Sequence, residues 1–241
     1  MDNVTTDALS AAASELSARV NLLDFGPPVS CVYNPLQYAR AGYEQYLQVA
    51  GAATRRIIFL GMNPGPWGMA QTGVPFGEIA AVRDWLGIDV PIGRPDPEHP
   101  KRLIQGLACT RSEVSGRRLW GLFAARFGQP QRFFARHFVA NYCPLVFMED
   151  GGRNRTPDKL PTSQRQALFQ ACDLHLQAIC RALEADVVVG VGRFAADRAR
   201  AALAEWDTQV AQILHPSPAS PLANRGWGEH ASRQLVELGL W

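Results

Sequence analysis

Four short apolar runs, separated by segments long enough to form helices, constrain the fold of this chain more than any other feature. The runs are RRIIFLG (55–61), HFVANYC (137–143), ADVVVGVG (185–192) and TQVAQIL (208–214). Strands that are apolar along their whole length are typically buried on both faces, and helical connections between them favour parallel pairing. We therefore expect an α/β fold with a parallel sheet covered by helices on both faces.

Helices are predicted between and around these runs. Apolar residues recur at three- and four-residue spacing in Thr6–Leu23 and Gln37–Ala50. In the segment 115–128, Ser115 is a typical N-cap and Gly128 a typical C-terminal residue. Further helices are expected from near Glu78 and over 163–184, 193–205 and 225–241, and the proline-rich segment 94–100 is expected to be a loop.

Composition indicates one globular domain. The chain has 241 residues, of which 47% are hydrophobic and 19% charged, so we expect a single domain over 1–241 with a helical N-terminal extension at 1–30. No apolar stretch approaches the roughly 20 residues of a membrane span, and the N-terminus lacks the pattern of a signal peptide. We expect a protein without membrane association, cytoplasmic and nucleoid-associated in a bacterium or nuclear in a eukaryote.

The cysteines and charges narrow the possible functions. Five cysteines without a C-x-x-C pair favour reduced thiols over a disulfide framework or a zinc or iron–sulfur site. The net charge is only +2, but between Lys101 and Arg155 ten basic residues stand against three acidic ones. Such a local excess can attract a polyanion, although a solvated charged face has the same composition.

The segment 61–77, GMNPGPWGMAQTGVPFG, follows the first apolar run directly. Its glycines allow close approach of the backbone, and its prolines reduce the entropy lost when the loop becomes ordered. This loop is expected to form a rigid pocket wall against a flat or charged group.

Polar side chains stand where three of the predicted strands end. Asn63 follows the first strand, Asn141 lies at the end of the second, and His215 follows the fourth. In open α/β sheets the ligand crevice lies beyond the carboxyl ends of the strands, so these side chains should converge. Together they form a hydrogen-bonding set that is poor in strong bases and in metal ligands.

Longer motifs connect these residues to a known family. GMNPGPWGMAQTGVPFGE and HPSPASPLANRGW resemble the two active-site motifs of the uracil-DNA glycosylase superfamily, and most closely those of its single-strand-selective monofunctional family. SEVSGRRLWGLF, NYCPLVFM and VVGVGRFA are similar to that family too. The resemblance implies a three-layer α/β/α fold around a four-stranded parallel sheet. It also implies a monomeric DNA repair enzyme that removes uracil and some 5-substituted uracils from single- and double-stranded DNA, with no metal or organic cofactor.

The chemistry of glycosidic cleavage assigns roles to two residues. The departing uracil gains negative charge, which a hydrogen bond from His215 to O2 would stabilise. The amide of Asn63 cannot act as a base near pH 7, but its carbonyl oxygen can orient the attacking water. We therefore expect Asn63 and His215 to be the catalytic residues.

The remaining expected substrate contacts come from the same motifs. The amide of Asn141 can pair with O4 and N3 of uracil, and Phe76 matches a position that stacks on the flipped base. Gly65 and Met69 match positions beside the C5 edge of the base, where missing bulk could admit a 5-hydroxymethyl group. Gly61 and Met62 complete the substrate-binding set.

DNA contacts are expected from the second motif and from the basic segment. Ser217, Ala219 and Arg225 belong to the motif, whereas Arg117 and Arg118, together with Arg153 and Arg155, belong to the basic segment. Ala219 departs from the vertebrate members of the family, which carry an arginine there as part of a wedge that fills the gap left by the flipped base.

Three alternatives stay open on the sequence alone. Gly190, Gly192 and Ala195 form G-x-G-x-x-A after a strand, with Asp207 further on, as in dinucleotide-binding oxidoreductases. A non-catalytic DNA-binding module would leave Asn63 and His215 idle. Cys143 beside Asn141 is a candidate nucleophile, although the motifs provide no base for it.

Overall fold

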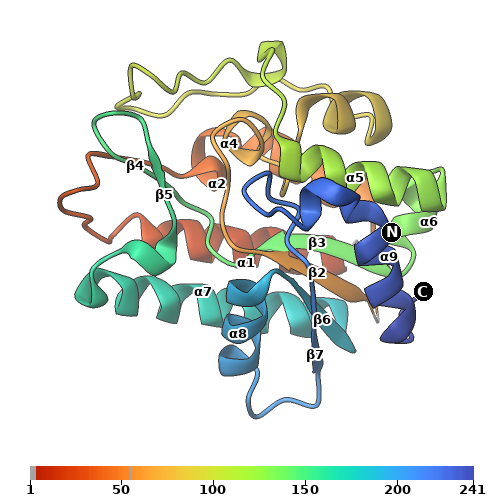
Figure 1. Ribbon diagram of the computed structural model, residues 1–241. Helices are drawn as coiled ribbons and strands as arrows, with labels where there is room; N and C mark the ends of the chain where they lie inside the picture. The colour runs from red at the N-terminus through yellow and green to blue at the C-terminus, as the bar shows by residue number, and fades with distance from the viewer. Residues whose placement is uncertain (1–3, 55) are drawn as a thin grey trace.

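The structure, a computed structural model, describes residues 4–54 and 56–241, and a parallel sheet lies at its centre (Figure 1). Its four strands have the order β3-β2-β6-β7 and comprise β2 Ile57–Gly61, β3 His137–Asn141, β6 Val187–Val191 and β7 Gln209–Ile213. All three pairings are parallel. The predicted parallel sheet is therefore confirmed, except that Arg55 of the first apolar run lies outside the described residues.

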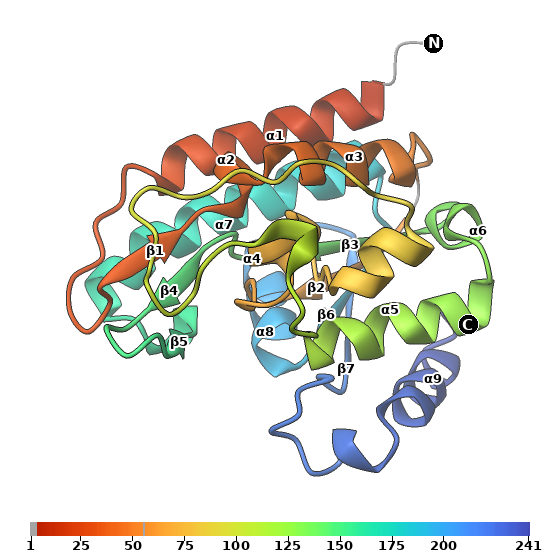
Figure 2. The same ribbon diagram turned by 90° about the horizontal axis from the view of Figure 1, so that it is seen from above.

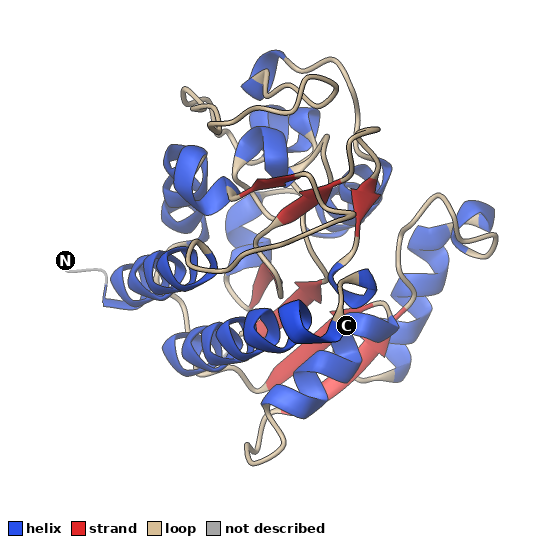
Figure 3. Cartoon of the chain, turned by 90° about the vertical axis from the view of Figure 1, so that its left-hand side faces the viewer, coloured by secondary structure: helices blue, strands red, loops and turns tan. Residues whose placement is uncertain are grey.

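Helices cover both faces of this sheet, as the views in Figures 2 and 3 make clear. α1 packs against α7, and α7 against α8, while α5 packs against α9. The helices are α1 Val4–Val20, α2 Pro35–Tyr38, α3 Arg40–Ala50, α4 Met69–Thr72, α5 Val114–Phe127, α6 Pro130–Phe134, α7 Thr162–Leu183, α8 Arg193–Ala202 and α9 Trp227–Glu237. Single turns are η1 Ala81–Trp85, η2 Gly106–Ala108, η3 Pro157–Lys159 and η4 Ala223–Arg225.

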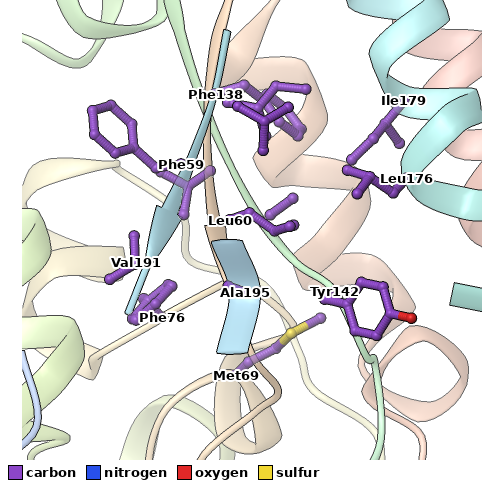
Figure 4. Packing of buried hydrophobic residues seen from close by; sticks show 14 of the residues in the cluster. Phe59, Leu60, Met69, Phe76, Phe138, Tyr142, Leu176, Ile179, Val191 and Ala195 are labelled. Carbon is purple, nitrogen blue, oxygen red and sulfur yellow. The ribbon is translucent and has the colours of Figure 1, made fainter. Parts of the chain in front are cut away.

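Burial on both sides explains why the strands are apolar throughout. Every residue of β2 is buried. Phe59 points to the α5 side, where its ring centroid lies 4.8 Å from that of Phe123, while Leu176 and Ile179 of α7 lie on the other side of the strand (Figure 4). None of the described helices combines the length and the apolar character that crossing a bilayer demands.

A second, antiparallel sheet has the order β1-β4-β5 and was not predicted from the sequence. Its strands are β1 Cys31–Tyr33, β4 Val146–Met148 and β5 Asn154–Arg155. Strands of two or three residues are too short for hydrophobic periodicity to reveal them. The sheet holds the segment that follows β3 and directs β5 toward the ends of the parallel strands.

Two helix predictions need correction. α5 begins at Val114, and its N-cap is Glu113 rather than Ser115, because the carbonyl of Glu113 accepts the first helical hydrogen bond, from the N–H of Arg117. Ser115 lies in the first turn and is buried. The helix expected near Glu78 is a short segment that passes into the π-helical turn η1, and the carboxylate of Glu78 accepts a hydrogen bond from the N–H of Ala81.

Two buried histidines make the fold sensitive to acid. The side chains of His137 and His175 donate Nδ1–H bonds to the carbonyls of Phe133 and Ala12, and burial lowers the pKa of each histidine from 6.5 to about 4. Both rings are therefore neutral in the folded protein at pH 5 but protonated in the unfolded chain. Stability is complete above pH 6.5 and is lost as the pH falls from 6.5 toward 4.

We expect each histidine to remove about 2 kcal/mol from the free energy of unfolding between pH 7 and pH 5. Urea unfolding at the two pH values measures this loss. His175→Gln should reduce the difference between the two pH values by about 2 kcal/mol. An unchanged difference in this variant would mean that His175 is already protonated in the folded protein.

Candidate active site

A cavity of about 340 Å³ opens beyond the carboxyl ends of the parallel strands, and residues that follow β2 and β7 meet there with the last residue of β3. Asn63, Asn141 and His215 all contribute to its wall. The complete lining is Met62, Asn63, Pro64, Gly65, Phe76, Glu113, Ser115, Asn141, Asn154, Thr156, His215 and Ser217. Its volume suits a single pyrimidine ring with room for water.

Asn63 is held by two hydrogen bonds from the same nitrogen. Its Nδ2 donates to the carbonyls of Pro64 and Leu145 at 3.3 and 3.2 Å. Because both bonds use the amide N–H₂ group, Oδ1 retains its capacity to accept a hydrogen bond from a molecule in the cavity. The structure thus gives Asn63 the orientation of a fixed acceptor.

His215 is a neutral hydrogen-bond donor. The backbone N–H of Ser217 donates to Nδ1 at 3.0 Å, which requires that nitrogen to be unprotonated and places the ring proton on Nε2. Burial lowers the pKa of His215 to about 4, in agreement with a neutral ring. A Cβ atom on Gly192, where φ is +92°, would lie 2.9 Å from the His215 Cβ, so the glycine allows the histidine its position.

Phe76 forms a flat wall of the cavity in a strained backbone conformation. Its φ is 53°, a left-handed value that is rare for a bulky residue and that clusters at functional sites. Trp120 of α5 holds the preceding residue through a 3.1 Å bond from Nε1 to the Pro75 carbonyl. A Cβ on Gly116 would lie 2.0 Å from the Phe76 carbonyl oxygen, so helix and loop pack backbone to backbone.

The amide of Asn141 also has a defined orientation. Its Nδ2 donates to the sulfur of Met69 at 3.2 Å. Since a thioether can accept but not donate, this contact favours one of the two amide orientations. Gly61 is required here because a Cβ would lie 2.6 Å from the Asn141 oxygen and 2.4 Å from the Phe76 ring.

Glu113 lines this cavity, although the sequence analysis did not predict it as a site residue. Burial, with the nearby carboxylate of Glu78 as a second cause, raises the pKa of Glu113 to about 7. The expectation of a set poor in bases is therefore incomplete, because a carboxyl group of shifted pKa lies in the same wall. Its signal in the sequence was weak: an acidic residue just before a helix is usually a cap.

Three further polar residues of the lining were not predicted, namely Ser115, Asn154 and Thr156. Asn154 and Thr156 reach the cavity through the small antiparallel sheet, which the sequence pattern did not reveal. The Oδ1 atom of Asn154 is buried and has no hydrogen-bond partner among residues 4–54 and 56–241. It is available to a bound ligand or water.

The residues expected to bind DNA lie outside the cavity, apart from Ser217. Arg117, Ala219 and Arg225 are exposed. Arg118 instead ties α5 to the loop after His215, since its Nη1 donates to the carbonyls of Pro216 and Ser217 and its Nη2 to the side chain of Asn224.

Two alternatives from the sequence lose their support. Gly190 is explained by packing, because a Cβ there would lie 2.3 Å from the backbone nitrogen of Ala196, and Gly192 makes room for His215. The glycine pattern therefore needs no dinucleotide to explain it. Cys143 is fully buried and does not line the cavity, so it is not in position to act as a nucleophile.

Two other features of the molecule do not form a comparable site. In the part of the chain that the structure describes, no group of three or more His, Cys, Asp or Glu side chains is arranged to hold a metal ion. A larger cavity of about 540 Å³ lies between the end of α1 and the loop at 94–96, away from the residues that end the parallel strands. Asn63, Asn141 and His215 do not line it.

Comparisons with known proteins point in one direction. A model of the family "Uracil DNA glycosylase superfamily" matches residues 49–234. The single-strand selective monofunctional uracil DNA glycosylases of Mus musculus and Rattus norvegicus are each 50% identical over 227 residues, or 93% of this chain and 81% and 82% of theirs. The enzyme of that name from Bos taurus is 49% identical over 227 residues, 93% of this chain and 84% of its own.

A solved structure supports the fold. The crystal structure of wild-type SMUG2 from Pedobacter heparinus matches with a TM-score of 0.64 at 15% identity, and the match covers 95% of this chain and 97% of that one. At this identity the likeness concerns the fold alone.

Proposed function

Because the chain belongs to the single-strand selective monofunctional family of the uracil-DNA glycosylase superfamily and is a uracil-DNA glycosylase, we propose that it also removes uracils with a polar substituent at C5 and initiates base excision repair. The observation that carries the mechanism is the pairing of a neutral imidazole donor with a fixed amide acceptor in one cavity. This pair fits the cleavage of a bond whose leaving group becomes an anion.

In the proposed mechanism the two catalytic residues act on opposite sides of the breaking bond. As the bond between N1 and the sugar lengthens, negative charge develops on uracil O2, and the Nε2–H group of His215 stabilises it. Because the His215 ring is neutral, it stabilises the departing uracil by a hydrogen bond alone and does not first transfer a proton to the base. Oδ1 of Asn63 accepts a hydrogen bond from the water and holds it against the anomeric carbon, where positive charge develops.

The same proposal gives the other residues binding roles. The flipped uracil stacks on Phe76, which replaces the neighbours that the base leaves behind. The amide of Asn141 donates to O4 and accepts from N3–H, and the Met69 sulfur supports this orientation. Gly65 leaves room for a substituent at C5, because the group beyond it is the carboxyl group of Glu113 rather than an aromatic ring.

A glycosylase assay tests the whole proposal. Oligonucleotides that carry uracil, 5-hydroxymethyluracil or thymine, each as a single strand and as a duplex, are incubated with the protein, and base release is measured after alkaline cleavage. We expect release of the first two bases and intact strands before the alkali step. Release of uracil alone would contradict the proposed activity on substituted bases.

Selectivity against cytosine should depend on the amide at position 141. Asn141→Asp introduces a group that, once protonated, can donate and accept in either direction, so cytosine release from a single strand should become detectable. Asn154→Asp, at another asparagine of the same cavity, is the matched control and should release no cytosine. Retained uracil activity in Asn141→Asp without any cytosine release would mean that Asn141 does not face the base.

Phosphate contacts are proposed for the exposed arginines near the cavity. Arg117→Ala should weaken binding to all DNA sequences equally and reduce the slope of log affinity against log salt by roughly one. Arg155 is the matched control, because Glu149 already pairs with it at 2.9 Å and its loss should change the slope less. An unchanged slope in Arg117→Ala would assign that arginine to a solvated face.

A further inference from the structure

The side chain of Glu113 makes unusual contacts for a residue at the start of a helix. It is the N-cap residue of α5, yet its carboxylate makes no capping hydrogen bond and has no other hydrogen-bond partner in the described chain. Instead it packs against the glycine-rich loop. A Cβ on Gly68 would lie 2.0 Å from Oε2, and a Cβ on Gly65 would lie 3.3 Å from Oε1.

The environment of this carboxyl group favours its neutral form. Removal from water disfavours the charge, and no cation among residues 4–54 and 56–241 offsets this effect on the pKa of Glu113. The nearby carboxylate of Glu78 carries the same sign and raises that pKa further. His215 in the same cavity is neutral over this pH range. Near neutral pH about half of Glu113 is therefore a carboxylic acid, and below neutral pH most of it is; the acid can both donate and accept a hydrogen bond.

A series of contacts locates this acid relative to the base. Asn141 contacts the sulfur of Met69, Met69 follows Gly68, and Gly68 packs on the Glu113 carboxylate. On the proposed function, on which this inference rests, Asn141 binds N3 and O4 of uracil. The next ring atom beyond C4 is C5, so the carboxyl group lies toward the 5-position.

We propose that Glu113 is a specificity-determining residue whose carboxylic acid hydrogen bonds with an oxygen attached to C5 of the flipped uracil. A 5-formyl oxygen accepts from the acid O–H, and a 5-hydroxymethyl group can accept from the acid or donate to either form of the carboxyl group. The methyl group of thymine offers neither a donor nor an acceptor, so thymine gains nothing from this carboxyl group. No proton is transferred in this recognition.

The two substituents should respond differently to pH. The formyl oxygen accepts only, so its recognition requires the protonated acid and should weaken as the pH rises through about 7. The hydroxymethyl group can donate to the carboxylate that replaces the acid, so its recognition should persist. Expressing each kcat/KM relative to that of uracil removes effects that act on all substrates equally.

The experiment measures these two ratios from pH 6 to pH 8 in single-stranded oligonucleotides for the wild type, Glu113→Gln, Glu113→Ala and Glu78→Gln. We expect the formyl ratio of the wild type to fall with pH while the hydroxymethyl ratio does not. Glu113→Gln introduces an isosteric amide that donates at every pH, so the formyl ratio should become independent of pH. The variant also controls for ionisation of the substrate, because any pH effect of the substrate itself would remain in it. In Glu113→Ala both ratios should fall about tenfold, as expected for the loss of one hydrogen bond.

Glu78→Gln keeps an acceptor for the N–H of Ala81 but removes the like charge, so the midpoint of the formyl ratio should move to lower pH.

Unchanged ratios in Glu113→Ala would overturn the assignment of Glu113 while leaving the proposed function intact. A uracil rate that rises through pH 7 and is lost in Glu113→Gln, at constant ratios, would instead identify Glu113 as a base for the water. A wild type that releases uracil but neither substituted base would contradict the proposed function and this inference together.

Discussion

Asn63→Ala and His215→Ala are each expected to slow uracil release in single turnovers by one to three powers of ten, on the order of 1.4 to 4 kcal/mol in the barrier. His215→Ala removes the donor to the developing anion, and Asn63→Ala removes the acceptor that orients the water. Affinity for uracil-containing DNA should change much less, because both interactions strengthen mainly in the transition state. Rapid-quench measurements at saturating enzyme separate the chemical step from binding.

Asn63→Asp distinguishes an orienting amide from a base. The Asn63 amide donates to two carbonyl oxygens, which would repel a carboxylate at the same place. We therefore expect a loss in this variant as well, and a rate that holds or rises would show that a true base is accepted there.

The wild-type rate should show no inflection from His215 between pH 5 and pH 8, since its pKa is about 4. Variants within threefold of the wild type would remove the residue concerned from the active site.

Uracil release from a single strand is expected to be at least about tenfold faster than from a U·A duplex, with a U·G mispair between them. Flipping a base out of a duplex costs a few kcal/mol of pairing and stacking, whereas a single strand has no partner to lose. Ala219 is exposed in the loop after His215 and is too short to fill the gap that a flipped base leaves. The mouse, rat and cattle relatives are named single-strand selective, which agrees with this expectation.

Ala219→Arg should strengthen binding to a duplex with an abasic site and narrow the difference between the two strand forms. Leu222, 47% exposed in the same loop, is the alternative wedge. Leu222→Ala is therefore the matched variant, and it should slow only the duplex reaction if this side chain already fills the gap. Equal wild-type rates on both strand forms, with no change in abasic affinity in Ala219→Arg, would mean that flipping does not limit the reaction.

Local sequence pattern was sufficient to predict the parallel sheet and most of the long helices that cover it. Runs such as 187–191 are apolar on both sides because both faces of the sheet are covered, and helix periodicity depends only on residues three or four positions apart. Asn63 and His215 were also predictable, since each follows a strand inside a long motif, and such strand ends meet at one edge of a parallel sheet. The short antiparallel sheet was not predictable, because its strands have only two or three residues and one of its two pairings, β1 with β4, joins segments more than 100 residues apart in the chain.

The chemical state of the site, by contrast, depends on contacts that no local pattern contains. Asn63 is oriented by the carbonyl of Leu145, 82 residues away, and the pKa of His215 falls because the folded chain buries the ring. Glu113 looks like an ordinary helix cap in the sequence, and only its packing against Gly65 and Gly68 places its carboxyl group in the cavity. Sequence thus determined that Asn63, Asn141 and His215 stand at the ends of parallel strands, because residue identity and strand pattern are local. Their orientation and protonation were decided by tertiary packing, because burial and hydrogen bonding depend on neighbours that are distant in the chain.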